Sequence, residues 1–227
     1  MTTQPVAFYD RVEDALRDSS LQTALDRATT RFVANRANAL AQLTDFEDLR
    51  ARARAIRAGA LARLDDLLVR LAENVERRGG HVCWAEDGQQ ARDYITSLAR
   101  DRGVRLVVKS KSMASEEIHL NHALEEAGLE VVETDLGEYI IQLSGETPSH
   151  IIAPAIHKTR EQVRDLFERH LGMEPTDDIP TMTRAARAAL RQRFLQADMG
   201  ISGVNFGVAN EGAVCIVENE GNARLTT

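Results

Sequence analysis

The sequence contains few of the residues on which several common kinds of site depend. Only two of its 227 residues are cysteine, Cys83 and Cys215, and they lie far apart along the chain. Two such residues make neither a disulfide framework nor a cysteine-ligated metal centre. Each lies in an apolar run, HVCWA or AVCIV, so we expect both to be small buried hydrophobic side chains.

Excess positive charge and long apolar runs are also missing. The net charge of −7 argues against a nucleic-acid partner, because neutralising phosphates requires clustered Lys and Arg. One segment is rich in arginine, but the spacing spreads its side chains around a helix, which predicts a solvated surface; they are Arg50, Arg52, Arg54, Arg57 and Arg63. The chain starts without a basic region followed by an apolar run, so we predict a cytoplasmic protein with no membrane span.

Helical periodicity dominates the first third of the chain. Residues 10–78 predict helices over 11–17, 21–43 and 45–78, with a break and cap at Ser19 and Ser20 and a capping box over 44–47. The pair Gly79-Gly80 ends the last helix. We therefore predict a helical N-terminal extension over residues 1–79, which supplies packing surface and a place for a partner subunit.

From residue 80 the pattern alternates between strands and helices. It predicts strands over 81–86, 105–108, 129–134 and 149–154, with helices over 87–103, 112–127, 159–170 and 181–198. Strands separated by single helices indicate an α/β domain over residues 80–227, with a mostly parallel sheet flanked by helices. Near the end of the chain, Asn210-Glu211-Gly212 between two apolar runs predicts a hairpin.

A loop of alternating cations and hydroxyls follows the strand at 105–108. It consists of Lys109, Ser110, Lys111 and Ser112. Ser112 is a suitable N-cap, and a helix start with nearby lysines attracts a carboxylate or a phosphate. The loop has no glycine, so it is neither a Walker A loop nor a dinucleotide-binding turn. The alternative interpretation is a capped helix with two solvated lysines.

Three strand-to-helix junctions are expected to converge, because ligands of parallel sheets bind beyond the carboxyl ends of the strands. These junctions are residues 109–112, Asp135 and residues 155–158, which include His157, the histidine that we assign to the cleft. His119 and His122 are three residues apart on a predicted helix, a spacing that metal sites use, but they lie off its apolar stripe and are expected on the surface.

Four separated stretches carry a family resemblance: the Lys-Ser loop, ETDLGEYIIQL, PSHIIAPAIHKTREQV and GVNFGVANEGAVCIVENEGNARL. In this order, over residues 50–227, they resemble the N-terminal LUD domain of the lactate utilisation protein B family. The resemblance implies an α/β fold related to ribose-phosphate isomerase, glucosamine-phosphate isomerase and CoA-transferase domains. It also implies membership of a cytosolic iron–sulfur complex that oxidises L-lactate to pyruvate.

The [4Fe–4S] clusters of that family lie in a later ferredoxin-like region with CxxCxxC-type runs. These 227 residues contain no such run, so we expect the chain itself to hold no cofactor. The sequence is then either a fragment of a longer protein or a lone LUD domain. Electron transfer is expected in the missing region or in partner subunits of the lactate-oxidation complex.

The resemblance also strengthens the assignment of a ligand site, since the related isomerases bind substrate phosphate at a comparable loop. We expect a small anionic metabolite to bind Lys109, Ser110, Lys111, Ser112, Asp135, His157, Glu211, Gly212, Asn219, Gly221 and Asn222.

Four carboxylates are candidates for catalysis, and three of them have a simpler explanation. The turn ENEG resembles the glutamate turn of CoA-transferases, in which the carboxylate attacks a thioester, so Glu211 and Glu218 are candidate nucleophiles. The simpler interpretation of these residues and of Glu220 is a solvated turn. Asp135 is a candidate acid or base, as is Glu138, but Asp135 is equally suitable as an N-cap.

Three functions therefore remain open. The first is a LUD-domain subunit of the lactate-oxidising complex that binds a small anion or organises partner subunits. The second is a free-standing isomerase or acyl-CoA-transferase type of enzyme that uses a turn glutamate. The third is a non-catalytic assembly domain whose long helices form the contact surface.

Overall fold

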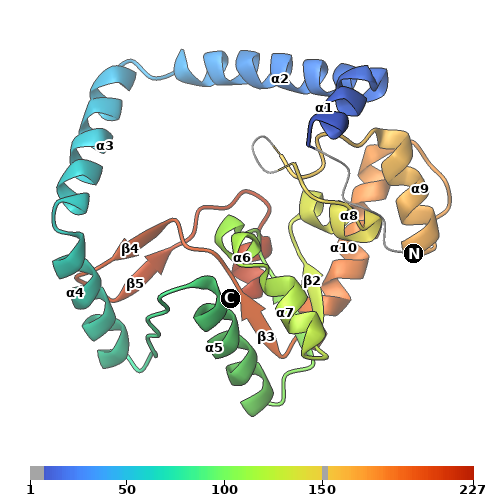
Figure 1. The fold of residues 1–227 in the computed structure, drawn as a ribbon. Coiled ribbons are helices and arrows are strands. Elements are labelled where there is room, and N and C mark those ends of the chain that lie inside the picture. The colour runs from blue at the N-terminus through green and yellow to red at the C-terminus, as the bar shows by residue number, and fades with distance from the viewer. Residues whose placement is uncertain (1–7, 150–152) are drawn as a thin grey trace.

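A three-stranded parallel sheet lies at the centre of the α/β part of the molecule (Figure 1). The computed structural model describes residues 8–149 and 153–227, and its central strands are β1 (Leu106–Lys109), β2 (Glu130–Glu133) and β3 (Met199–Ile201). Their order is β2-β1-β3, and both pairings are parallel. The predicted α/β class with a mostly parallel sheet, flanking helices and a helical N-terminus is confirmed.

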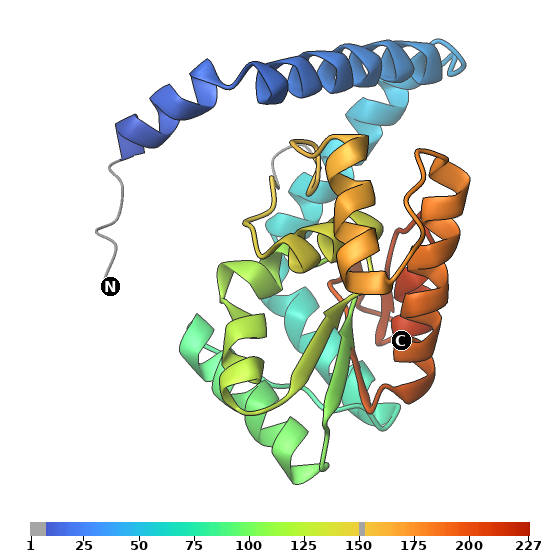
Figure 2. The same ribbon diagram turned by 90° about the vertical axis from the view of Figure 1, so that its right-hand side faces the viewer.

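Alternating side chains of the central strands build two cores, one on each face of the sheet. Val107 and Val131 pack with residues of α5 (Gly88–Asp101) and α7 (Leu120–Glu126). Their neighbours Val108 and Val132 point to the opposite face and pack with α8 (Leu136–Ser144) and α10 (Ile179–Gln196). A third apolar cluster joins α8 and α10 to α9 (Arg160–Leu171), so the helices form layers on both faces, as Figure 2 shows.

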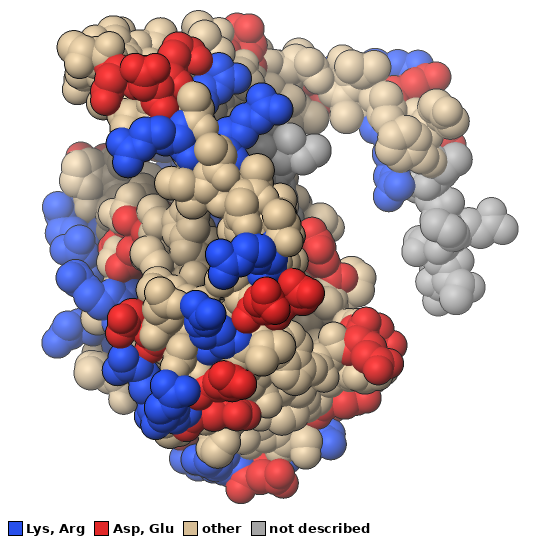
Figure 3. Space-filling view, turned by 90° about the vertical axis from the view of Figure 1, so that its left-hand side faces the viewer, with Lys and Arg blue, Asp and Glu red and all other residues tan. Residues whose placement is uncertain are grey.

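Four helices precede this part and form an arch beside it (Figure 1). They are α1 (Phe8–Arg17), α2 (Ser19–Leu40), α3 (Phe46–Leu61) and α4 (Leu64–Arg77). None of their described residues is buried. The arginines between positions 50 and 63 are exposed as predicted, and Figure 3 shows basic and acidic side chains intermingled on one face of the molecule.

The boundaries within the arch differ from the predicted ones. Asp18, not Ser19 or Ser20, caps α2, because its carboxylate accepts backbone N–H groups of Ser20 and Leu21. The predicted capping box over 44–47 is wrong, since Asp45 is the N-cap of α3 and makes no side-chain cap bond. The long third helix is also broken, between α3 and α4.

A two-stranded antiparallel hairpin rests on α4 and connects the arch to the α/β part. Its strands are β4 (Phe206–Val208) and β5 (Ala213–Cys215), so the predicted hairpin is confirmed. Gly207 and Gly212 allow the close approach: a Cβ atom at Gly207 would lie 2.9 Å from Leu71, and one at Gly212 would overlap the Asn74 backbone. The short helix α11 (Asn222–Thr226) then ends the chain beside β1 and β3.

Several other predictions need correction. Residues 81–86 form no strand, and both Cys83 and Cys215 are exposed, because neither segment lies inside a sheet that has helices on both sides. The helix predicted over 112–127 is broken into α6 (Met113–Glu117) and α7 at His119, whose φ of 53° is left-handed. The strand predicted over 149–154 includes residues 150–152, which lie outside the described part. Strand β3 was not predicted in the parallel sheet.

None of the helices in the described ranges combines the length and apolarity needed to cross a membrane. The division at residue 79 into an extension and a core stays a prediction.

The close packing of α11 against Gly200 of β3 allows a test of the fold. A Cβ atom at Gly200 would overlap the Thr226 carbonyl oxygen, so Gly200→Ala should displace α11 and lower the free energy of unfolding by about 1–3 kcal/mol. Gly59→Ala is the control, because Gly59 lies in α3 with nothing near its Cβ position, and it should stabilise by about 0.5–1 kcal/mol. Urea unfolding followed by circular dichroism measures both, and equal effects would contradict the described packing.

Candidate functional site

A buried ion pair joins the carboxyl ends of β1 and β2. The parallel register pairs Lys109 with Glu133, and each lies two residues beyond a valine of the α7 side of the sheet. Their side chains therefore meet on that face, with Lys109 Nζ 2.8 Å from Glu133 Oε1 and side-chain exposures of 0% and 5%. Ser115 Oγ accepts from the same amine at 3.0 Å, and Asn121 Nδ2 donates to Glu133 Oε1 at 2.7 Å.

A second ion pair lies beside the first. Asp135 caps α8 by accepting the N–H groups of Gly137 and Glu138, and this fixes Glu138 in the first turn of the helix. The Glu138 side chain is 3% exposed, and its Oε1 lies 3.1 Å from Nζ of Lys111, whose side chain is 34% exposed. The two pairs form a continuous charged layer where the strands end.

Glu116 of α6 adds a third carboxylate to this layer. Burial, and then the nearby negative charge of Glu138, raise its pKa from the ordinary 4.5 to about 7. Burial also raises the pKa of Glu133, although Lys109 acts in the opposite direction. We call the five residues Lys109, Lys111, Glu116, Glu133 and Glu138 the charge cluster.

A cavity of about 430 Å³ lies on one side of the charge cluster, and we call it the Lys-Ser cleft. It is formed where the loop after β1, the start of α8 and the segment after β5 meet. Seven predicted site or catalytic residues line it: Ser110, Lys111, Ser112, Asp135, Glu218, Asn219 and Asn222. Two of the three junctions predicted to converge, residues 109–112 and Asp135, thus meet at this cleft, whereas residues 155–158 do not line it.

Backbone N–H groups already bind the two acidic side chains of the cleft. Asp135 is held at the start of α8, and Glu218 accepts from the N–H groups of Ala223 and Arg224 at 2.7 and 3.3 Å, which orders the first turn of α11. The Ser110 hydroxyl donates to Ser202 Oγ at 2.8 Å. These bonds make Asp135 an N-cap, as its simpler interpretation proposed, whereas Glu218 binds backbone N–H groups of α11 and is not the solvated turn residue that we expected.

Four other predicted residues lie elsewhere. Lys109 does not line the cleft, because its side chain is buried in the ion pair with Glu133. Glu211, at the tip of the β4–β5 hairpin, pairs with Arg78 at 3.0 Å, and Gly212 lies against the Asn74 backbone of α4. His157 is held by Ser149 Oγ and Glu146 Oε2, each at 2.9 Å.

The last predicted residue, Gly221, is the N-cap of α11 with a φ of 81°, directly before the cleft residue Asn222. Its left-handed backbone is the conformation that glycine adopts without strain.

Three polar residues of this region were not predicted as site residues: Ser115, Asn121 and Glu133. The sequence could have indicated that Glu133 is buried, because it lies two positions after Val131 in the same predicted strand and therefore on the same face of the sheet. Asn121 becomes visible only when α7 is placed over the strand ends. No group of three or more His, Cys, Asp or Glu side chains suited to a metal ion occurs within residues 8–149 and 153–227.

The fold and this cleft define an α/β domain with a charged site at the carboxyl edge of a parallel sheet, and its family is shown by comparison. Residues 68–227 match the LUD domain, and the chain belongs to the LUD-domain family. It is similar to proteins named lactate utilization protein B from Bacillus thuringiensis (strain Al Hakam), Bacillus cereus (strain B4264) and Bacillus anthracis (strain A0248).

Each of these three relatives is 49% identical to the chain over 218 residues. The match covers 96% of this chain but only 46% of each relative, so the chain spans about half of their length. No solved structure matches the chain.

The buried pair of Lys109 and Glu133 predicts a large and specific loss of stability. Lys109→Met leaves a buried carboxylate without its cation, so the free energy of unfolding should fall by about 3–5 kcal/mol, and adding Glu133→Gln should restore part of it. The exposed pair of Arg17 and Glu13, 2.7 Å apart, supplies the control: Arg17→Met should change stability by less than about 1 kcal/mol. Urea unfolding at neutral pH measures all variants, and equal losses for both single variants would contradict the assignment.

The raised pKa of Glu116 predicts a pH dependence with a definite sign. A carboxyl group with a raised pKa in the folded state contributes stability that is full below its ordinary 4.5 and lost as the pH rises through about 7. Wild type should therefore lose stability relative to Glu116→Gln between about pH 5 and about pH 8.5 in urea unfolding. The exposed neighbour Glu117 provides the matched variant Glu117→Gln, and an identical pH dependence for both variants would argue against a perturbed Glu116.

Proposed function

We propose that this chain is the LUD-domain part of a cytoplasmic iron–sulfur system that oxidises L-lactate to pyruvate. The observation that carries the proposal is the 49% identity to proteins named lactate utilization protein B along 96% of the chain. Because the chain spans 46% of those proteins, the oxidation itself is proposed for the whole assembly and not for this domain alone. With only two cysteines, these residues do not fit a four-thiolate cluster, and the [4Fe–4S] clusters would be held by other parts of the assembly.

The Lys-Ser cleft is the proposed binding place for a small anionic metabolite of this system. Lys111 brings a partly exposed amine to the cleft, while Ser110, Asn219 and Asn222 bring hydroxyl and amide groups. Asp135 and Glu218 should repel a bound anion only weakly, because backbone N–H groups already donate to each carboxylate. A carboxylate such as lactate, with one charge and one hydroxyl, suits this mixture of one cation and several neutral groups.

A role in organising partner subunits is favoured by a separate observation. The arch helices expose large apolar side chains, among them Val33 at 70%, Ile56 at 67% and Leu61 at 67%. Apolar surface of this kind is typical of protein interfaces. The alternative of an acyl-transferase with a turn glutamate has less support, because Glu211 is in an ion pair with Arg78 and Glu218 caps α11.

A chimera tests the proposed function directly. This chain should replace the corresponding half of a Bacillus relative, and the chimera should restore growth on L-lactate to a strain that lacks that protein. Immunoblotting confirms that the chimera accumulates. Normal accumulation without growth on L-lactate, while the intact relative restores growth, would contradict the proposal.

Anion binding to the Lys-Ser cleft is tested by calorimetry with L-lactate and inorganic phosphate. One of these anions should bind, and Lys111→Gln should weaken its binding by about tenfold, because a charge-assisted hydrogen bond is lost. Arg187→Gln removes an exposed positive charge on α10, a helix that does not line the cleft, and should bind like wild type. Equal affinity in the two variants, or no binding at about 10 mM ligand, would remove the cleft from the proposal.

A further inference from the structure

Two buried oxygen atoms near the end of β2 accept no hydrogen bond within the described residues. They are Glu133 Oε2 and Asn121 Oδ1. Asn121 donates its Nδ2 to Glu133 Oε1 at 2.7 Å, and turning the amide over would bring two acceptors together, so Oδ1 must face away from that contact. A buried acceptor without a hydrogen bond destabilises the folded state, because it has lost its contact with water. The pair therefore marks a place where donors from another molecule would be stabilising.

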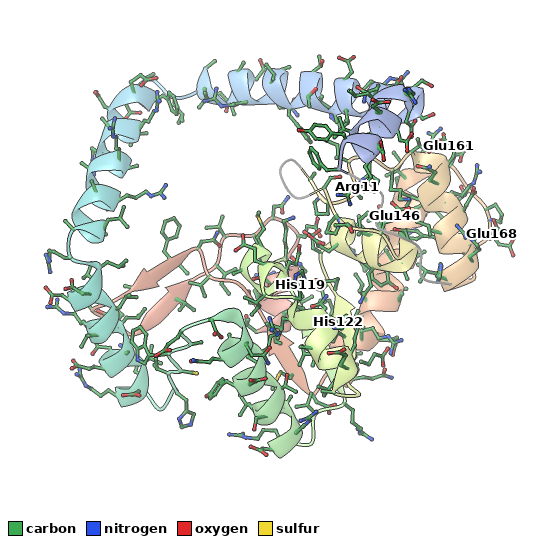
Figure 4. All side chains as sticks on the ribbon, in the orientation of Figure 1. Arg11, His119, His122, Glu146, Glu161 and Glu168 are labelled. Atoms are coloured by element: carbon green, nitrogen blue, oxygen red, sulfur yellow. The ribbon has the colours of Figure 1, made fainter. Side chains whose placement is uncertain are left out.

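Both residues line a second cavity of about 600 Å³, which we call the acidic cavity. It lies between the α6–α7 segment and α8, and Met113 is the one described residue that also lines the Lys-Ser cleft. In Figure 4, His119 and His122 mark the α6–α7 side, and Glu146 marks the segment that follows α8. Leu120, Ile141 and Pro148 add apolar surface to its lining.

Carboxylates outnumber amines around the acidic cavity. Six glutamates of the described chain line it: Glu116, Glu117, Glu125, Glu133, Glu138 and Glu146. Three lysines lie against them, Lys109 at Glu133, Lys111 at Glu138 and Lys158 at Glu146. Among the described residues, the six carboxylates and three amines leave a net negative charge, which attracts a cation.

We propose that the acidic cavity binds a small organic cation with a primary ammonium group. The ammonium donates to Glu133 Oε2 and Asn121 Oδ1, and an aliphatic body packs against Leu120 and Ile141. An ammonium group supplies three donors and one positive charge, which matches two acceptors in a negative cavity. A neutral alcohol supplies a donor but no charge. This site is separate from the anion site proposed for the Lys-Ser cleft and does not depend on it.

The test is calorimetric titration of the whole chain with n-pentylammonium at low salt, compared with n-pentanol and pentanoate. Saturable binding of n-pentylammonium should be at least about tenfold tighter than that of n-pentanol, because a hydrogen bond from a charged donor is stronger than one from a neutral donor. Pentanoate should not bind in this cavity. Binding should weaken as the pH falls through about 7, where Glu116 gains a proton beside Lys109, Lys111, Glu133 and Glu138.

Two variants locate the binding site. Asn121→Leu removes one acceptor and should weaken n-pentylammonium binding by about tenfold. Thr147→Trp places a large ring on an exposed residue of the cavity lining and should block binding without touching the charge cluster. Glu168→Gln controls for general electrostatic attraction, because it removes an exposed carboxylate on α9 that does not line the cavity, and it should leave affinity unchanged. Thermal unfolding establishes that each variant is folded.

Three results would overturn the proposal. The first is no binding of n-pentylammonium to the folded wild-type chain. The second is equal binding of n-pentanol, which would indicate only an apolar hollow. The third is unchanged affinity in folded Thr147→Trp, which would place the ammonium elsewhere on the surface. None of these results bears on the Lys-Ser cleft, whose own test uses anions and Lys111→Gln.

Discussion

The buried contact between Lys109 and Glu133 is the constraint on which the rest of the site depends. Taking two charges out of water is costly, and the cost is recovered only when the partners meet with good geometry. Here the parallel register supplies that geometry, because the two residues are direct neighbours on adjacent strands. A slip of one residue between β1 and β2 would send the side chains to opposite faces, so the pair also selects the register.

Much of the local structure was predictable because its causes are local. The strand predicted over 105–108, the caps Ser112 and Asp135, and the hairpin at 210–212 follow from short-range patterns that the structure confirms. The segment 81–86 has the composition of a strand but no neighbouring strand to pair with, and pairing is a long-range property that no window of residues reveals.

The site was predicted only in part, for a similar reason. Ser110, Lys111 and Ser112 meet Asn219 and Asn222 because parallel strands end at one edge of the sheet. The phase of the side-chain alternation decides that Lys109 points to α6 and not to the cleft. Glu211 is held away from it because the hairpin rests on α4, a contact between segments more than a hundred positions apart.

The charge cluster forms a partition between two hollows, and this arrangement has a thermodynamic consequence. Lys111 lines one hollow while its partner Glu138 lines the other. A ligand that draws the Lys111 amine into the Lys-Ser cleft leaves the Glu138 carboxylate less neutralised on the side of the acidic cavity. By thermodynamic linkage the effect is reciprocal: each ligand changes the affinity of the other by the same factor. If both hollows bind ligands, this shared ion pair is the contact through which one occupant would affect the affinity of the other.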